Sequence, residues 1–373
     1  MRLLDRYIAK QVFISAAFAV AVIIIILVLG NVFKEILREL AKRPDLSLGF
    51  VLKFIALVIP ISLSLAIPFS FLTAILLTFG RLSADSEFVS MRMAGLSMGR
   101  ICLPVGVLAL FFTVICAWVN LSITPAAKTE MEGMKASLIN LIKREPMLLF
   151  PDRQVMTELQ DHLVFANKEE DRLSSFQMIK LEGGLPQALV VASEAEVSVD
   201  LEKSEPELIL DLYEMNLLVK GEGGDFMGFS QPVYFDEARA GVPIRGLAQS
   251  GDDVRDQPEN ISLRRLFGKI ADRELEDEMR TTYRTELSMR MAFSVSCITF
   301  ALIGVPLGIT AQRRESSAGF VISMLIAVTY YVMLTMAQLT RTNEAMYPHL
   351  LVWVPNVLFF CLGLLLFRRL SKS

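Results

Sequence analysis

Histidine and cysteine are scarce in this sequence, with two and four copies in 373 residues. The two histidines, His162 and His349, lie far apart, and neither stands in a motif that binds a metal or activates a nucleophile. The cysteines have neither close pairing nor the histidine neighbours of a zinc site, and all fall inside apolar runs, at Cys102, Cys116, Cys297 and Cys361. We expect small buried apolar residues there and no metal site.

Motifs for nucleotide binding and hydrolytic chemistry are also absent, because no segment matches a Walker A loop, GxSxG or HExxH. The glycine-rich segment 221–224 joins two predicted strands instead of opening a helix, which is typical of a turn. We therefore expect a chain that is not an enzyme and binds no cofactor. If ATP powers this protein, a separate subunit must hold the ATP and Mg²⁺.

Long apolar runs are what the sequence has in excess. Hydrophobic residues make up 53% of the chain and the mean hydropathy is +0.48, above the share of about 45–50% in ordinary globular domains. A span of about 30 Å of hydrocarbon needs about 20 helical residues. Six charge-free runs are long enough, and they lie within 12–33, 53–81, 100–128, 290–313, 315–341 and 347–367. The first run is too long for a cleavable signal peptide, so a polytopic α-helical membrane protein with six transmembrane helices is predicted.

Charge divides the chain, with a net of −13 from Thr129 to Thr285 and +10 elsewhere. This division argues against nucleic acid as a partner. Lysine and arginine gather at the amino-terminal flank, in the loops after the second and fourth runs, and in the tail. The positive-inside rule then puts both termini in the cytoplasm and the acidic portion outside. One outward loop partly breaks the rule, because it carries Lys34, Arg38, Lys42 and Arg43.

The acidic portion begins with a β-rich pattern. From about Met147 to Phe235, apolar and polar residues alternate in runs separated by glycine and proline turn signals. This pattern predicts an inserted, antiparallel all-β domain of seven to ten short strands. A helical return segment over about 260–285, capped by Asn260 or Ser262, should lead into the fourth run. The predicted domains are 1–128, 129–285 and 286–373.

The loop between the second and third runs carries the pattern of a short helix over about 84–95. Ser83, Asp85 and Ser86 can cap its start. Glu87 suits the dipole of the first turn, and Gly95 supplies a left-handed stop. The residues available for packing are Phe88, Val89, Met91 and Met93. The helix either lies on the lipid headgroups or docks into a groove of an ATPase, with methionine and phenylalanine as anchors.

Glu286 and Arg290 stand four residues apart where the acidic portion meets the fourth run, acid before base, which favours an intrahelical ion pair. We interpret them as a membrane-edge ion pair, with a hinge that transmits motion to the β domain as the alternative. Pro60, Pro68 and Pro306 predict kinks in the second and fourth runs. No ionisable side chain lies deep in a run, which disfavours a proton- or sodium-coupled transporter.

Four stretches together resemble one family. They are GRLSADSEFVSMRMAGLS at Gly80–Ser97, LLDRYIAKQV near the amino terminus, TELSMRMAFSVSCITFALIGVPLGI in the fourth apolar run and VWVPN in the sixth apolar run. In order and spacing they resemble the LptF/LptG (YjgP/YjgQ) lipopolysaccharide export permeases over the whole chain. The resemblance implies a half-transporter that pairs with a second LptF/LptG-type permease and a dimeric LptB-type ATPase. It also implies that the inserted domain is a periplasmic β-jellyroll, which passes lipopolysaccharide to a β-jellyroll bridge of the LptC/LptA type.

The resemblance further suggests roles for single residues. Glu87 matches by position the acidic residue of the family's coupling helix, and its neighbours there are Asp85, Ser86, Phe88, Met91 and Gly95. Lys34 resembles in position a basic residue that the family uses near the lipid headgroup, and the same side carries Arg38, Lys42 and Arg43. A phosphorylated glycolipid would meet such cations at headgroup depth. Ordinary snorkelling of interfacial side chains is the alternative.

The predicted function is a permease subunit of an ATP-driven lipopolysaccharide exporter in the inner membrane of a Gram-negative-type bacterium. It would extract the lipid from the outer leaflet and pass it to the periplasmic bridge. Two alternatives stay open. One is an ABC membrane subunit that transmits force without carrying lipid, and the other is a membrane-anchored receptor or assembly factor.

Overall fold

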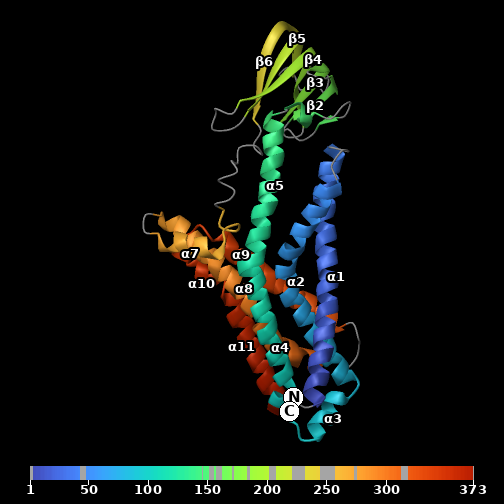
Figure 1. Cartoon of the computed structure of the whole chain (residues 1–373), viewed down its shortest axis with the longest axis vertical. Helices are drawn as coiled ribbons and strands as arrows, with labels where there is room; N and C mark the ends of the chain where they lie inside the picture. Colours follow the sequence, from blue (N-terminus) through green and yellow to red (C-terminus); the bar gives the residue numbers. More distant parts are fainter. Residues whose placement is uncertain are drawn as a thin grey trace. The chain divides into compact units, whose positions relative to one another are not determined.

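A computed structural model of the chain provides the fold (Figure 1). The residues described are 3–42, 48–144, 146–150, 155–156, 162–169, 172–182, 185–200, 207–220, 232–243, 257–272, 275–311 and 318–372. The chain divides into a helical unit, formed by 1–37, 47–131 and 255–373, and a sheet unit, formed by 38–46 and 132–254. The return segment after 254, which the sequence pattern assigned to the β domain, groups with the helical unit instead.

Six helices of the described chain are long and apolar enough to cross a membrane, within 3–30, 51–84, 98–134, 277–310, 319–339 and 348–370. The six predicted spans are therefore confirmed by length and composition. The third span is one continuous rod, in which α4 (Met98–Trp118) passes through a π-helical turn, η1 (Val119–Ile123), into α5 (Thr124–Arg144). The other elements are α1 (Leu3–Lys42), α2 (Leu48–Ala84), α3 (Glu87–Met93), α7 (Leu263–Ala271), α8 (Asp277–Ala311), α9 (Ala318–Leu339), η3 (Glu344–Met346), α10 (Pro348–Leu351) and α11 (Val354–Lys372).

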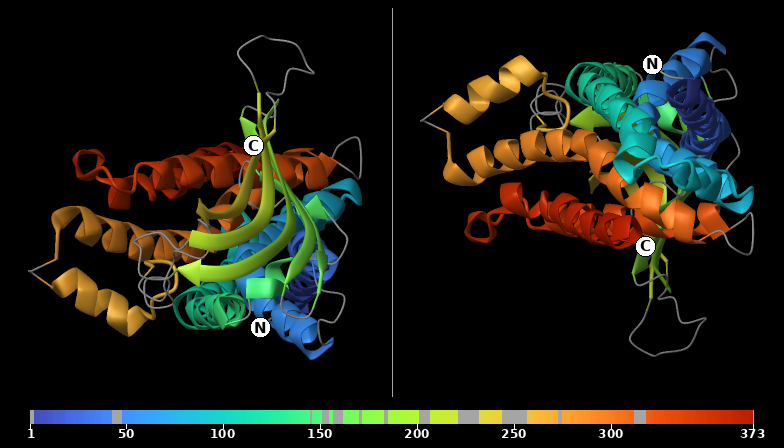
Figure 2. Two further views of the ribbon diagram at one scale, coloured as in Figure 1. Left: turned by 90° about the horizontal axis from the view of Figure 1, so that it is seen from above. Right: turned by 90° about the horizontal axis from the view of Figure 1, so that it is seen from below.

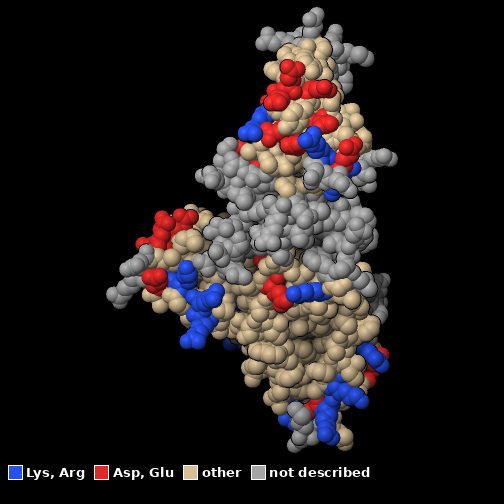
Figure 3. Space-filling view, turned by 45° about the horizontal axis from the view of Figure 1, so that its top comes forward, with Lys and Arg blue, Asp and Glu red and all other residues tan. Residues whose placement is uncertain are grey.

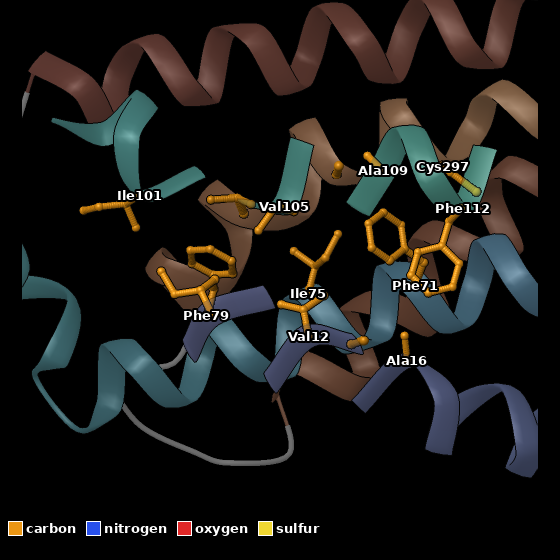
Figure 4. Close-up of a cluster of buried hydrophobic side chains, with 14 of the residues drawn as sticks. Val12, Ala16, Phe71, Ile75, Phe79, Ile101, Val105, Ala109, Phe112 and Cys297 are labelled. Atoms are coloured by element: carbon orange, nitrogen blue, oxygen red, sulfur yellow. The ribbon is translucent and has the colours of Figure 1, made fainter. Parts of the chain in front are cut away.

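The largest buried cluster of the helical unit joins α1, α2, α4 and α8 (Figure 4). Phe71, Ile75 and Phe79 of α2 lie at its centre, and side chains of the other three helices surround them, including Val12, Ala16, Ile101, Val105, Ala109, Phe112 and Cys297. The opposite side of α1 faces outward, with Ile14 at 55% and Phe18 at 72% exposure. Because lipid is as apolar as the core, shape and close packing decide which face turns inward.

Glycines bring α8 close to its neighbours. A Cβ on Gly308 would lie 3.0 Å from the Phe79 Cβ of α2, and one on Gly363 of α11 would lie 3.0 Å from the backbone nitrogen of Ile303. These approaches leave no room for a side chain, as is typical of helix packing in membranes. The central helix of the unit is therefore α8, which packs closely against both α2 and α11.

Asn356, a polar side chain within the sixth span, finds partners inside the bundle. Asn356 donates to the Ala292 carbonyl at 2.7 Å and accepts from the Tyr330 hydroxyl at 3.2 Å. These bonds join α11, α8 and α9 where water cannot compensate an unpaired group. Of the cysteines, Cys116 and Cys297 are buried as expected, whereas Cys361 is exposed on α11, so the expectation of burial is wrong there.

The sheet unit holds a six-stranded antiparallel sheet in which each strand pairs with the next along the chain. The strands are β1 (Val155–Met156), β2 (His162–Lys168), β3 (Leu173–Glu182), β4 (Leu185–Asp200), β5 (Glu207–Val219) and β6 (Val233–Pro243). The inserted antiparallel β domain is thus confirmed. The described strands are fewer and longer than expected, since β4 alone has 16 residues, and Figure 2 shows them curving along their length.

Alternation along each strand gives the sheet one apolar face. Leu208, Leu210 and Leu212 of β5 are at most 1% exposed, while the intervening residues are more accessible. Phe176 on β3 and Phe150, which follows the turn η2 (Pro146–Leu149), join the same buried cluster. Successive side chains of a strand point to opposite faces, so the apolar face is continuous across β2 to β5.

The other face of the sheet is charged. Arg172 pairs with Glu194 at 2.8 Å and with Glu196 at 3.1 Å, and Arg239 pairs with Asp211 at 2.6 Å. Figure 3 shows acidic side chains spread over this unit, with few basic ones between them. Such exposed pairs contribute little to stability, about 0–1 kcal/mol each, and their main effect is to keep this face in water.

Candidate functional site

The short helix predicted in the second loop is present as α3, but its start differs from the expected one. Ser86 adopts a left-handed conformation with φ 60° and makes no side-chain cap. Its carbonyl instead accepts from the Ser90 backbone nitrogen at 3.0 Å and the Ser90 hydroxyl at 2.9 Å. At the other end Gly95 has φ +83°, the left-handed stop that the sequence indicated.

One side of α3 is held by the helical unit. Phe88 is 8% exposed and belongs to the buried cluster of α1, α2, α4 and α8. The Tyr7 hydroxyl of α1 donates to the Glu87 carboxylate at 3.2 Å. Next to this contact, Arg100 at the start of α4 pairs with Asp5 of α1 at 2.8 Å. The position of α3 is thus tied to the first turns of α1, which Arg100 in turn joins to the start of α4.

The other side of α3 is apolar and faces outward. Met93 is 85% exposed and Val89, one turn earlier on the same face, is 51% exposed. Phe88 and Met91, which the sequence pattern offered as anchors for a partner, pack on the chain's own core instead. Asp85 lies just before the helix, 3.5 Å from Arg81. The exposed apolar pair Val89 and Met93 is therefore the part of α3 that a partner can contact.

A second group of polar contacts surrounds Arg290 of α8. We call it the boundary node, and it comprises Arg290, Glu286 and the segment 258–261 with its partners. Arg290 Nε donates to Glu286 Oε1 at 2.8 Å, so the ion pair suggested by the i, i+4 spacing is present. The same guanidinium donates to the backbone carbonyls of Ile261 at 3.1 Å, Pro258 at 3.0 Å and Glu259 at 3.1 Å. The Arg290 and Glu286 side chains are only 7% and 13% exposed. Arg290 thereby fastens the return segment 258–261 to α8.

The side chain of Glu259 extends the boundary node to two more spans. It accepts from Lys128 of α5 at 3.3 Å and from Arg341, just after α9, at 3.1 Å. Burial raises the pKa of Glu259, but these two cations lower it by more, so the pKa lies below its ordinary range. The Thr129 hydroxyl also donates to the Asn260 carbonyl at 2.8 Å. The contacts of Glu259 have no local sequence signal, because its partners are 131 and 82 residues away.

A chain of hydrogen bonds continues from the boundary node into the third span. The Ser294 hydroxyl donates to the Arg290 carbonyl at 2.8 Å, and Asn120 Nδ2 donates to Ser294 Oγ at 3.2 Å. Asn120 is 8% exposed and lies in η1, the π-helical turn. Single π-helical turns in α-helices are frequent at functional sites. The third span thus departs from α-helical geometry at the turn where Asn120 bonds to α8.

The residues predicted to bind a lipid headgroup fall outside the part whose side chains are described. Only the backbone is described at Lys34, Arg38 and Lys42, which lie in α1, and Arg43 lies outside the described residues. Their role stays a prediction.

Known proteins resemble this chain over nearly its whole length. The sequence model of the family described as "Lipopolysaccharide export system permease LptF/LptG" matches residues 6–369. The chain belongs to the LptF/LptG lipopolysaccharide export permease family. The proteins named lipopolysaccharide export system permease protein LptF from Escherichia coli K12, Escherichia coli O157:H7 and Shigella flexneri are each 22% identical to it over 371 residues. The alignments cover 97% of this chain and 93% of each relative.

The LptF/LptG match covers all of the sheet unit and all of the helical unit except residues 1–5 and 370–373. This permease is therefore a multi-pass membrane protein of lipopolysaccharide export, as the resemblance of its motifs predicted. The match also encloses α3 and the boundary node.

Loss of Arg290 should destabilise the LptF/LptG-family fold strongly. The variant Arg290→Ala leaves the buried Glu286 and three carbonyls without their shared donor, which for buried ion pairs costs about 3–5 kcal/mol. We expect a clearly lower thermal midpoint in detergent. Arg284→Ala, an exposed arginine earlier on α8, is the control and should change stability by no more than about 0.5 kcal/mol. Equal shifts in the two variants would contradict a special role for Arg290.

The lowered pKa of Glu259 gives a pH signature. A carboxyl group whose pKa is lower in the folded state stabilises the fold above its unfolded pKa of about 4.3. That contribution is lost as the pH falls through the lower folded pKa. We expect the parent chain to melt at a higher temperature than Glu259→Gln at pH 7, and the difference to shrink as the pH falls below about 4.3. Glu278→Gln, exposed at the start of α8, should show no such gap. A Glu259→Gln difference that stays constant with pH would rule the idea out.

Proposed function

We propose that this permease takes lipopolysaccharide from the outer leaflet of the inner membrane and passes it through its sheet unit to a periplasmic β-jellyroll bridge of the LptC/LptA type. A dimeric LptB-type ATPase supplies the work from the cytoplasm, and a second LptF/LptG-type permease completes the lipid cavity. The observation that carries the proposal is the continuous apolar face of the sheet. Acyl chains need such a lining, because each methylene exposed to water costs about 0.8 kcal/mol.

The orientation in this proposal follows from charge. Six spans put both termini, α3 and the loop after α8 on one side, and basic residues gather there, at Arg6, Lys10, Arg92, Arg100, Arg313, Arg314, Arg368 and Arg369. Under the positive-inside rule this side is cytoplasmic. The acidic sheet unit and the boundary node then lie on the periplasmic side.

Coupling to the ATPase runs through α3. Val89 and Met93 give the docking groove two apolar contacts, and Glu87 orients the helix through Tyr7. Just before α3, the Ser83 hydroxyl donates to the Ile309 carbonyl near the end of α8 at 2.9 Å. From Ile309 back to Arg290, α8 extends about 29 Å at 1.5 Å per residue. A displacement of α3 is thereby transmitted along α8 to the boundary node, with no cofactor bound by this chain.

The lipid contacts of the proposal involve three surfaces. Lys34, Arg38, Lys42 and Arg43 face the phosphates of the lipid at headgroup depth, where charge-assisted bonds are strong. Within the first span, only 11% of the residues in the most apolar 18-residue stretch are buried. The exposed side of α1 lines the cavity towards the second permease. In the sheet unit, β6 pairs only with β5 among the described strands. Its open edge suits strand addition by the bridge protein.

Two rival functions remain distinct from this proposal. A mechanotransmitting ABC subunit uses the same α3 and α8 but carries no lipid on its sheet. A membrane-anchored receptor or assembly factor has no ATPase at α3.

The docking role of α3 predicts that Met93→Asp reduces the amount of copurifying ATPase at least about tenfold, because an unpaired charge buried at an interface costs several kcal/mol. The measurement is the ratio of ATPase to permease after affinity purification of the coexpressed complex. Met346→Asp provides the control, since Met346 is 53% exposed in η3, near the periplasmic ends of the fifth and sixth spans. An unchanged ratio for Met93→Asp would favour the receptor.

The lipid-carrying role predicts that two adjacent residues of β3 differ in their crosslinking to lipid. Phe176 is fully buried on the apolar face, and its neighbour Gln177 is exposed on the other. A photoreactive phenylalanine analogue at position 176 should crosslink lipopolysaccharide in reconstituted complexes only when ATP is added. The same analogue at position 177 should not. Absence of labelling at both positions, with ATPase activity intact, would support the mechanotransmitter instead.

A further inference from the structure

The helix α7, Leu263–Ala271, is amphipathic, and the proposed function makes no use of it. Leu263, Leu266 and Ile270 fall on one face at helical spacing, and the helix also carries three basic residues and no acidic one. Leu266 is fully buried in a cluster with Ile261 and Tyr283, against which Ile270, Leu275 and Leu287 pack. The apolar face of α7 is thus seated against the first turns of α8.

The contacts of α7 define its depth relative to the span. Arg290 is the last charged residue of α8 before the apolar stretch that ends at Ala311. Tyr283 and Leu287, which α7 contacts, precede Arg290 by seven and three residues, or about 5–10 Å along the helix axis. A bilayer headgroup layer is about 5–8 Å thick on each side of the hydrocarbon. The helix α7 therefore lies at headgroup depth, immediately after the segment 258–261 that Arg290 holds.

The part of α7 that α8 leaves uncovered combines an aromatic ring with cations. Phe267 is 55% exposed although it borders the buried face, and Arg264 and Arg265 are exposed as well. Figure 3 shows Lys and Arg gathered on one side of the projection that α7 and the start of α8 form, with Asp and Glu towards its upper side and outer end. A basic helix with an uncovered aromatic residue matches the composition of helices that lie in a membrane interface.

We propose that α7 is an interfacial helix that binds the anionic phospholipids of the adjacent leaflet. Phe267 inserts at the boundary between headgroups and acyl chains, and Arg264 and Arg265 contact phosphate groups. An anionic bilayer surface is the occupant that the charge favours, because it is complementary to the exposed Arg264 and Arg265 and lies at the depth that the contacts define. The bound lipid holds α7 and, through Ser262 and Ile261, the return segment. This binding depends only on the spans crossing a membrane, so it holds whether or not the sheet carries lipopolysaccharide.

The test places an environment-sensitive fluorophore at position 267. The variant Phe267→Cys is made in a chain whose four native cysteines are replaced, labelled with bimane, and reconstituted with lipids that carry a nitroxide quencher at a shallow position. Quenching by nitroxide-labelled phosphatidylglycerol and by nitroxide-labelled phosphatidylcholine is compared in turn. We expect efficient shallow quenching and a preference for phosphatidylglycerol. Arg264→Gln combined with Arg265→Gln should reduce that preference at least about tenfold at low ionic strength.

The matched control is Arg172→Gln combined with Arg239→Gln, which removes two exposed arginines from the sheet unit and should leave the preference unchanged. Thermal midpoints of both double variants verify that each is folded. A fluorophore that an aqueous quencher reaches fully and lipid nitroxides do not would overturn the interfacial placement. Equal quenching by the two lipids in the parent chain, or a preference that survives loss of both arginines, would overturn the recognition of anionic lipid.

Discussion

The neutralisation of one buried guanidinium is the constraint on which the architecture of this permease depends. Arg290 stands where α8 enters the apolar part of the molecule, and a cation there is tolerated only with nearly all of its donors paired. Glu286 supplies one acceptor, and the carbonyls of Pro258, Glu259 and Ile261 supply three. Those carbonyls are available only if the chain returning from the sheet unit lies along α8. The return path is therefore defined by the requirement to solvate this charge.

Features governed by local composition could be predicted from the sequence. A membrane span needs about 20 apolar residues whatever the fold, so six spans were evident. Glu286 and Arg290 are a local pair, since four residues make one helical turn, and Gly95 is a local stop, since its φ of +83° favours glycine. Period-two alternation likewise revealed the inserted sheet and its apolar face. Two of the glycine and proline turn signals, at 183–184 and 205–206, fall between the bounds of β3, β4 and β5.

Features that depend on distant partners could not be predicted in the same way. The pattern of α3 showed four apolar residues but not which would turn inward, because the answer depends on the core that Phe88 enters beside α1 and α4. Glu259 stood in a polar stretch and looked like an ordinary surface residue. Its importance follows from Lys128 and Arg341, which three-dimensional packing alone brings to it. The burial of Cys361 was predicted wrongly for a related reason, since an apolar residue in a membrane helix can face either the bundle or the lipid.

The order of the strands has a consequence for biogenesis. Each described strand of the sheet unit pairs with its neighbour in the chain, from β1 to β6. Hairpin pairing of this kind requires only short loop closures, which are fast compared with joining segments far apart in sequence. Each strand can therefore add to the growing sheet soon after it has been synthesised, before α8, α9 and α11 follow. The six strands can therefore pair while the carboxyl-terminal spans are still to be made, so the sheet unit does not need those spans to begin folding.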